Sequence, residues 1–333
     1  MTELRFARVA DAVVRTLSAV KEGESVLVVA DTGTNLAIAH AYLAAAINVG
    51  AKAALVVERE RRITEVAPVP SVNGALERAD VVLGLGRSLF TRSEGCQTAL
   101  ARGARVLVTE PRGMEDYLIE GIVGVDYDGL VSNAKRLGRA LAAADRCTIR
   151  SELGTDISCK VGGRPVIIGD GMALDPGELD YYPGCQVTFA PVEETLEGVI
   201  VVDGSMSTLG LVSEPFRLVV EAGKVVAIEG GVDARRYKQH LEQQGDPKLF
   251  EICHYSFGMN PRASLSGNIF EDERYYGCLD IGFGSQDPSW GGTVGTSKHH
   301  VDIVMASPEV TFDNTTVIQN NQFAPGLGFL NLG

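Results

Sequence analysis

The sequence lacks the features that mark secreted, membrane-spanning and nucleic-acid-binding proteins. Its six cysteines include no CxxC pair, and its 30 basic side chains form no cluster and are outnumbered by 43 acidic ones, for a net charge of −13. Because nucleic-acid binding depends on concentrated positive charge, we expect no nucleic-acid partner. The first residues, MTELRFARVADAVV, resemble neither a signal peptide nor a membrane span. We therefore expect a cytoplasmic protein, without a membrane partner, whose cysteines are reduced and mostly buried.

Several common catalytic motifs are absent as well. The turn after the first strand-like run is Asp31-Thr32-Gly33-Thr34-Asn35, which is not the Gly-x-Gly-x-x-Gly pattern of dinucleotide sites. There is no P-loop, no Gly-x-Ser-x-Gly elbow and no His-Glu-x-x-His pair. The N-terminal half is therefore interpreted as a scaffold rather than a nucleotide site.

The pattern of apolar residues predicts two domains, as expected for 333 residues. Residues 1–150 alternate helix-period and strand-like runs, which predicts a Rossmann-like α/β domain with three to four parallel strands. Residues 151–333 are richer in Gly, Asp and Thr and contain short β-branched runs, which predicts an α+β domain with mainly antiparallel sheet. Within it, residues 216–231 predict a hairpin around Ala222-Gly223, and residues 233–244 predict a helix.

The sequence has only five histidines, so their positions are informative. His40 and His240 lie in helical segments and are interpreted as packed or surface residues. His300 and Asp302 lie two apart in a predicted strand, so their side chains project to the same face and can chelate one metal ion. In the alternative interpretation, Asp302 only orients His300 or the pair forms a polar strand edge.

His254 is the candidate for a third ligand. Together with His300 and Asp302 it would supply two imidazoles and one carboxylate, the donor set that holds non-haem Fe(II) and leaves coordination positions open. The same set can hold Zn²⁺ with a bound water for hydrolysis. Spacing alone does not choose between these metals.

Several segments of the second half resemble the thermophilic aminopeptidase family (aminopeptidase T type). The motifs are Gly154-Thr155-Asp156-Ile157, residues 184–191 and residues 197–204, and the likeness continues to His300-Val301-Asp302. In the peptidases of that family, glutamates in the segments matching 184–191 and 253–261 help to hold a pair of metal ions. Here those positions are Gln186 and His254, which disfavours a two-metal peptidase because two adjacent dications require negative charge.

The sequence is most similar to one branch of that family, the 2,5-dihydroxypyridine 5,6-dioxygenases. This resemblance implies mononuclear Fe(II) held by His254, His300 and Asp302, a small hydroxylated N-heterocycle or aromatic as substrate, and ring opening with both atoms of dioxygen. It also implies catalytic roles for Gln186, through a hydrogen bond to the substrate ring, and for Tyr255, in an aromatic-binding pocket. Relatives self-associate, so we expect a homo-oligomer.

Two other functions remain open from the sequence. One is a metal-dependent aminopeptidase or amidohydrolase that uses Zn or Co. The other is a non-catalytic member that binds a ligand or supports an assembly.

Overall fold

The structure is a computed structural model that describes residues 2–61 and 67–332. The chain divides into two compact units, residues 1–125 with 169–184 and residues 126–168 with 185–333. This division differs from the single boundary expected at residue 150. Helix α6 (Tyr127–Ala142) belongs to the second unit although it precedes residue 150, and residues 169–184 return to the first unit. The change in composition near residue 150 therefore does not coincide with the boundary between the two compact units.

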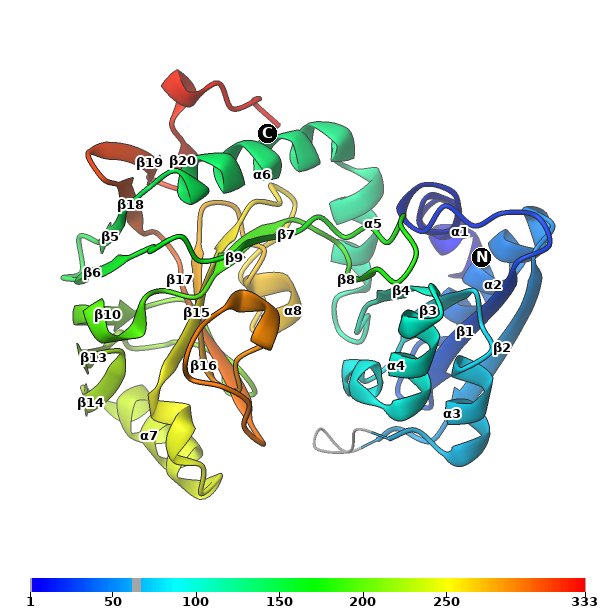
Figure 1. Cartoon of the computed structure of the whole chain (residues 1–333), viewed down its shortest axis with the longest axis horizontal. Helices are drawn as coiled ribbons and strands as arrows, with labels where there is room; N and C mark the ends of the chain where they lie inside the picture. Colours follow the sequence, from blue (N-terminus) through cyan, green and yellow to red (C-terminus); the bar gives the residue numbers. More distant parts are fainter. Residues whose placement is uncertain (1, 62–66, 333) are drawn as a thin grey trace. The chain divides into compact units, whose positions relative to one another are not determined.

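The first unit is built on a parallel sheet of five strands in the order β2-β1-β3-β4-β8 (Figure 1). Between its terminal residues Ser25 and Asp31, strand β1 is apolar and buried, which is typical of a parallel strand covered on both faces. The strands are β1 (Ser25–Asp31), β2 (Lys52–Glu58), β3 (Val81–Leu85), β4 (Arg105–Val108) and β8 (Leu179–Tyr181). The helices are α1 (Thr2–Ala12), α2 (Leu36–Asn48), α3 (Pro70–Leu76), α4 (Glu94–Ala101) and α5 (Glu115–Val123).

The Rossmann-like prediction for this unit is confirmed, with one strand more than expected. The turn predicted after β1 ends at Asn35, whose side chain accepts a hydrogen bond from the backbone N–H of Ala37 and caps α2. The additional strand, β8, pairs in parallel with β4 and comes from beyond residue 150. With three half-buried residues, β8 is too short to produce a recognisable pattern.

The second unit contains two mainly antiparallel sheets, which confirms the predicted class of this part. Sheet B has the order β14-β13-β10-β6-β5-β18-β19-β20, and sheet C has the order β12-β11-β17-β16-β15-β9-β7. Sheet B consists of β5 (Arg146–Arg150), β6 (Asp156–Lys160), β10 (Glu197–Val202), β13 (Phe216–Glu221), β14 (Lys224–Glu229), β18 (Glu309–Phe312), β19 (Thr315–Gln319) and β20 (Gln322–Phe323). Sheet C consists of β7 (Val166–Gly169), β9 (Gln186–Phe189), β11 (Ser205–Met206), β12 (Gly210–Leu211), β15 (Ile252–Gly258), β16 (Leu279–Gly284) and β17 (His300–Met305). Besides α6, the helices are α7 (Val232–Gln243) and α8 (Ile269–Asp272).

Two local predictions in this unit are confirmed. Strands β13 and β14 form the expected hairpin, and its turn residues Ala222 and Gly223 have φ angles of 47° and 77°, as a two-residue hairpin turn requires. The predicted helix at 233–244 is α7.

Sheets B and C pack against each other through one face of sheet C. Phe257 on β15 meets Phe312 on β18 edge to face, with 5.9 Å between ring centroids. This aromatic contact fills part of the core between the sheets. The opposite face of sheet C is thus free to carry polar side chains.

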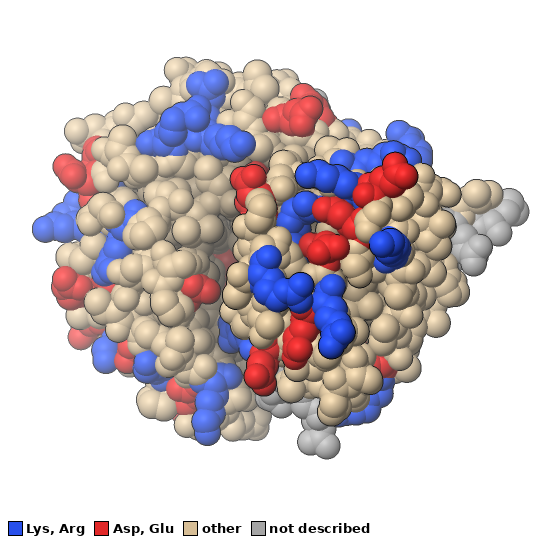
Figure 2. Space-filling view, turned by 45° about the vertical axis from the view of Figure 1, so that its right-hand side comes forward, with Lys and Arg blue, Asp and Glu red and all other residues tan. Residues whose placement is uncertain are grey.

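All six cysteines are free and buried, as predicted. No helix among residues 2–61 and 67–332 is long and apolar enough to cross a membrane. On the face shown in Figure 2, basic and acidic side chains are interspersed. In the first unit, Arg87 pairs with Glu60 at 3.1 Å and with Glu110 at 3.3 Å, so arginine charge near the carboxyl ends of the strands is balanced within the unit.

Candidate metal centre

The register of three neighbouring strands brings the predicted metal ligands together. His254 on β15 and Asp302 on β17 both lie opposite Gly282 on β16, and His300 lies opposite Gly284. Because side chains alternate along a strand, these residues project to the same face of sheet C. His254 is thereby joined to the His300–Asp302 pair, which lies far from it in the sequence.

Gly282 provides the space for the His254 ring. A Cβ atom at Gly282 would lie 2.1 Å from Cε1 and 2.2 Å from Nδ1 of His254, far closer than any normal contact. The imidazole therefore lies directly over the glycine backbone. Only the absence of a side chain at this position permits the placement.

The distance from Asp302 to each of the two predicted imidazole ligands fits a shared cation. Oδ1 of Asp302 lies 3.0 Å from Nε2 of His300 and 3.8 Å from Nε2 of His254. Two donors that each lie about 2 Å from one cation are about 3 to 4 Å apart. The two imidazole rings are nearly parallel, with an interplanar angle of 6° and centroids 5.3 Å apart. The chemistry of this donor set thus suits a divalent metal ion.

Hydrogen bonds fix the orientation of two of these ligands. Nδ1 of His300 lies 2.8 Å from the carbonyl oxygen of Ser285, so Nδ1 donates its proton there and Nε2 is the nitrogen that faces Asp302. Oδ2 of Asp302 accepts a hydrogen bond of 3.3 Å from the hydroxyl of Ser207, which leaves Oδ1 facing the imidazoles. Partners of this kind, on the ligand atom that does not bind the metal, are usual around protein metal sites.

Burial and the neighbouring charges give the two histidines different protonation states. Burial, assisted by the adjacent His300, lowers the pKa of His254 to about 3, so this imidazole is neutral. Burial alone would lower the pKa of His300 too, but the Asp302 carboxylate and Cys253 raise it well above its usual value. Although burial raises the pKa of Asp302, the His300 charge lowers it overall. The metal-free centre thus contains a neutral imidazole beside an ion pair.

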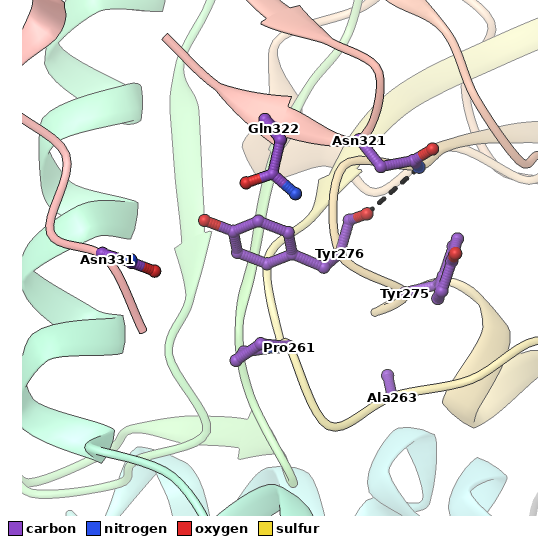
Figure 3. A pocket seen from close by; sticks show the side chains of 7 residues that line it. All are labelled: Pro261, Ala263, Tyr275, Tyr276, Asn321, Gln322 and Asn331. Atoms are coloured by element: carbon purple, nitrogen blue, oxygen red, sulfur yellow. Dashed lines mark hydrogen bonds between the residues drawn. The ribbon is translucent and has the colours of Figure 1, made fainter. Parts of the chain in front are cut away.

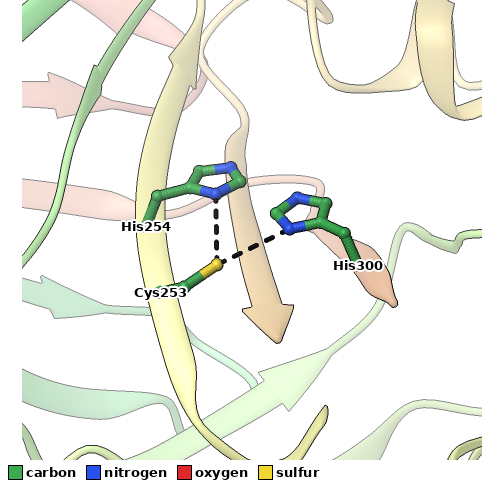
Figure 4. Close-up of side chains that lie close together, drawn as sticks. All are labelled: Cys253, His254 and His300. Carbon is green, nitrogen blue, oxygen red and sulfur yellow. Dashed lines mark hydrogen bonds between the residues drawn. The ribbon is translucent and has the colours of Figure 1, made fainter. Parts of the chain in front are cut away.

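Cys253 lies beside both imidazoles on their other edge, where an irregularity in the pairing of β15 between Ile252 and His254 interrupts the alternation of side chains (Figure 4). Its Sγ is 3.6 Å from Nδ1 of His254 and 3.7 Å from Nδ1 of His300, so these three residues form a second group of possible ligands. Nδ1 of His300 is already engaged with the Ser285 carbonyl, which disfavours metal binding on this edge. Burial also raises the pKa of the Cys253 thiol, which keeps it neutral.

Two residues at the centre were not predicted from the sequence. Asp280 on β16 is completely buried, and its Oδ2 lies 3.1 Å from Nε2 of His254. Trp290, the only tryptophan, has its ring edge-on to His254, with 4.8 Å between centroids. A signal for Asp280 existed, because an aspartate inside the apolar run LDIGFG needs a partner in the core.

The two residues predicted to be catalytic lie on opposite faces of sheet C. Gln186 on β9 shares the face of the metal ligands, and its Nε2 donates a hydrogen bond of 3.0 Å to the hydroxyl of Ser256. Its Oε1 is buried and has no hydrogen-bond partner among the described residues. Tyr255 instead projects into the core between the sheets, where its ring meets Phe189 edge-on at 5.9 Å. Tyr255 directly follows His254 on β15, and adjacent strand residues face opposite ways, so the structure does not bring it to the centre.

Two cavities lie apart from these ligands. One, of about 270 Å³, is lined by residues that include Tyr275, Tyr276 and Asn321, and Nδ2 of Asn321 donates a hydrogen bond of 3.2 Å to the carbonyl oxygen of Tyr276 (Figure 3). The other, of about 260 Å³, is lined by residues that include Glu193 and Glu251. Neither cavity is lined by His254, His300, Asp302 or Asp280.

A sheet face that gathers two imidazoles and a carboxylate defines a candidate metal-dependent enzyme with open coordination positions. The profile of the family of 2,5-dihydroxypyridine 5,6-dioxygenase (NicX) matches residues 9–325. The chain therefore belongs to this family, as the resemblance in the sequence had implied.

Individual relatives agree with this membership. The chain is 25% identical over 260 residues to a 2,5-dihydroxypyridine 5,6-dioxygenase of Pseudomonas putida KT2440, an alignment that covers 73% of this chain and 71% of the relative. The solved structure of the 2,5-dihydroxypyridine dioxygenase of Pseudomonas putida KT2440 superposes with a TM-score of 0.82 at 22% identity, over 97% of this chain and 98% of that one. Wild-type AmpT from Thermus thermophilus superposes with a TM-score of 0.68 at 14% identity, over 97% and 100% of the two chains. These two structures show that the fold is shared with both groups.

Proposed function

We propose that the chain is a mononuclear non-haem Fe(II) dioxygenase that opens the ring of a small hydroxylated N-heterocycle or aromatic, such as 2,5-dihydroxypyridine. The observation that carries the proposal is the approach of Asp302 Oδ1 to Nε2 of both His254 and His300 on one sheet face. Membership of a family named for this reaction supports it. Two imidazoles and one carboxylate are the donor set typical of Fe(II) oxygenases.

In this proposal His254, His300 and Asp302 hold the metal. When bound, Fe(II) supplies positions at which a substrate and dioxygen can meet and exchange electrons. Substrate approaches from the side of His300, whose side chain is 25% exposed, because the side chain of His254 is only 6% exposed. The Ser285 carbonyl and the Ser207 hydroxyl keep the ligand atoms aimed at the metal.

Gln186 has a supporting role in the proposal. Its amide lies on the face of the metal ligands, and the unpartnered Oε1 is able to accept a hydrogen bond from a ring N–H or hydroxyl group of the substrate. Tyr255, which packs in the core, has no part in it.

Dioxygen consumption tests the reaction. After reconstitution with Fe(II) under anaerobic conditions, the protein should take up dioxygen when 2,5-dihydroxypyridine is added. A metal-dependent hydrolase of amide or peptide bonds would instead consume no dioxygen and would work with Zn²⁺ or Co²⁺. Failure to take up dioxygen with hydroxypyridines or catechols, despite bound iron, would refute the proposed reaction.

A matched pair of histidine variants tests the ligands. His254→Ala should abolish metal binding, whereas His240→Ala should leave it unchanged. His240 lies on α7 rather than on the strands of the centre, and its Nε2 is 3.3 Å from the hydroxyl of Thr208. If both variants bind metal as the wild type does, the ligand assignment is wrong.

The expected homo-oligomer and cytoplasmic location also remain proposals. Size-exclusion chromatography with light scattering tests the first, and fractionation of the source cells tests the second.

A further inference from the structure

The inference concerns Asp280, and it rests on the proposed function. Asp280 lies on β16 opposite Ser256 of β15 and Val304 of β17, on the same sheet face as the three proposed metal ligands. Its side chain is completely buried. A carboxylate in such a position needs a cation or several hydrogen bonds to offset the loss of water.

The contacts of Asp280 do not meet that need. Oδ2 lies 3.1 Å from Nε2 of His254, while Oδ1 has no hydrogen-bond partner among the described residues. A buried polar atom without a partner destabilises the folded protein, and a charged one does so more. The carboxyl group is therefore incompletely satisfied by the protein, and its Oδ2 faces Nε2 of His254.

The position of Asp280 relative to the His254 ring separates two possible roles. A side chain that merely orients a metal-binding histidine contacts the ring nitrogen that does not bind the metal, as the Ser285 carbonyl does at Nδ1 of His300. Asp280 instead contacts Nε2 of His254, the nitrogen that also faces Asp302 Oδ1. A nitrogen that binds a metal carries no proton, so it has none to donate to Asp280.

The donor atoms of His254, Asp280 and Asp302 lie within 4.8 Å of one another and form a group able to hold a metal ion. His300 lies beside this group, with its Nε2 3.0 Å from Oδ1 of Asp302. We propose that Asp280 is a fourth protein ligand, so that one metal ion is held by His254, His300, Asp302 and Asp280. Two carboxylates and two neutral imidazoles cancel the charge of a dication. A neutral centre is less costly to bury than one with a net positive charge.

Anaerobic titration with Fe²⁺ alone, followed by elemental analysis and by the emission of Trp290, tests this ligand. The variant is Asp280→Asn, which keeps the shape and removes the charge. The control is Asp233→Asn, a change at another buried aspartate that lies on α7. Wild type and control should bind one Fe²⁺ per chain with equal affinity, and Asp280→Asn should bind it about 100-fold more weakly.

The visible absorption of Co²⁺-loaded protein distinguishes a ligand from a positioning residue. Loss of a ligand changes the wavelength and intensity of the cobalt bands at saturation, whereas loss of an orienting contact leaves the set of donor atoms unchanged. Thermal unfolding of the metal-free proteins shows whether Asp280→Asn is folded, and Asp280→Ala is the second variant if it is not.

The outcomes separate this inference from the proposed function. If wild type binds no metal, the proposed metal centre itself fails, and Asp280 with it. If wild type binds Fe²⁺ and Asp280→Asn binds it equally well, or saturates with an unchanged cobalt spectrum, only the fourth ligand is refuted. Weaker binding together with an altered spectrum supports it.

Discussion

The most direct test of the centre's geometry is Gly282→Ala. The new Cβ would lie 2.1 Å from Cε1 of His254, whereas carbon atoms in contact are normally about 3.5 Å apart, so the ring must move by about 1 Å or more. A misplacement of about 1 Å in a functional group costs about 100-fold. We therefore expect metal affinity to fall about 100-fold, which corresponds to about 2.8 kcal/mol.

Competition with a chelator of known affinity measures this loss. Gly74→Ala is the matched control, because a Cβ at Gly74 in helix α3 would meet no atom within 4 Å. That control should keep full metal affinity and gain about 0.5–1 kcal/mol of stability, since alanine restricts the unfolded chain more than glycine does. Wild-type metal affinity in folded Gly282→Ala protein would refute the placement of the His254 ring over Gly282.

Three further predictions concern the second unit. Ser207→Ala removes the hydroxyl that donates to Asp302 Oδ2 and should weaken metal binding about 10-fold in the same competition assay; unchanged affinity would contradict the orienting role. Burial alone would raise the pKa of Asp233, but backbone N–H groups and Arg236 lower it overall. The ionised carboxylate therefore stabilises the fold fully above about pH 4, and this stability is lost as the pH falls through the lowered pKa. Asp233→Asn should therefore lower the free energy of unfolding by about 1–3 kcal/mol at pH 7, and denaturant unfolding should show a smaller difference from wild type in acid. A difference that does not change with pH would contradict a stabilising role for the charge of Asp233. Trp290, with its ring centroid 4.8 Å from that of His254, should lose emission as Co²⁺ binds, and steady emission at saturation would place the metal elsewhere.

The sequence predicted those features of the metal centre that depend on the pattern within a single strand. Alternation along one strand correctly placed His300 and Asp302 on the same face, because side chains of a strand repeat every two residues. The same rule applied to β15 places Tyr255 on the sheet face opposite to that of His254. The prediction that Tyr255 belongs to the site therefore overlooked the alternation along this strand.

The remaining features depended on pairing between distant strands. Asp280 reaches His254 only because β16 lies between β15 and β17 in a particular register, which no pattern within β16 reveals. Strand β8 joined the first sheet for a similar reason, since its contacts with β4 decide its place and its own three residues do not. Long periodic segments such as α7 were predicted well, because their pattern is repeated over several turns.

The placement of metal ligands on adjacent strands has a consequence for the opening of the second unit. A cation bound by His254 and Asp302 would cross-link β15 and β17 across the middle strand of the three, so these strands could separate only after the metal had left. Backbone amides of β15, β16 and β17 should then exchange their hydrogens more slowly in loaded protein than in stripped protein, while those of the hairpin β13–β14 should change little. Loss of the metal ion would thus loosen the sheet and dismantle the proposed catalytic centre in a single event.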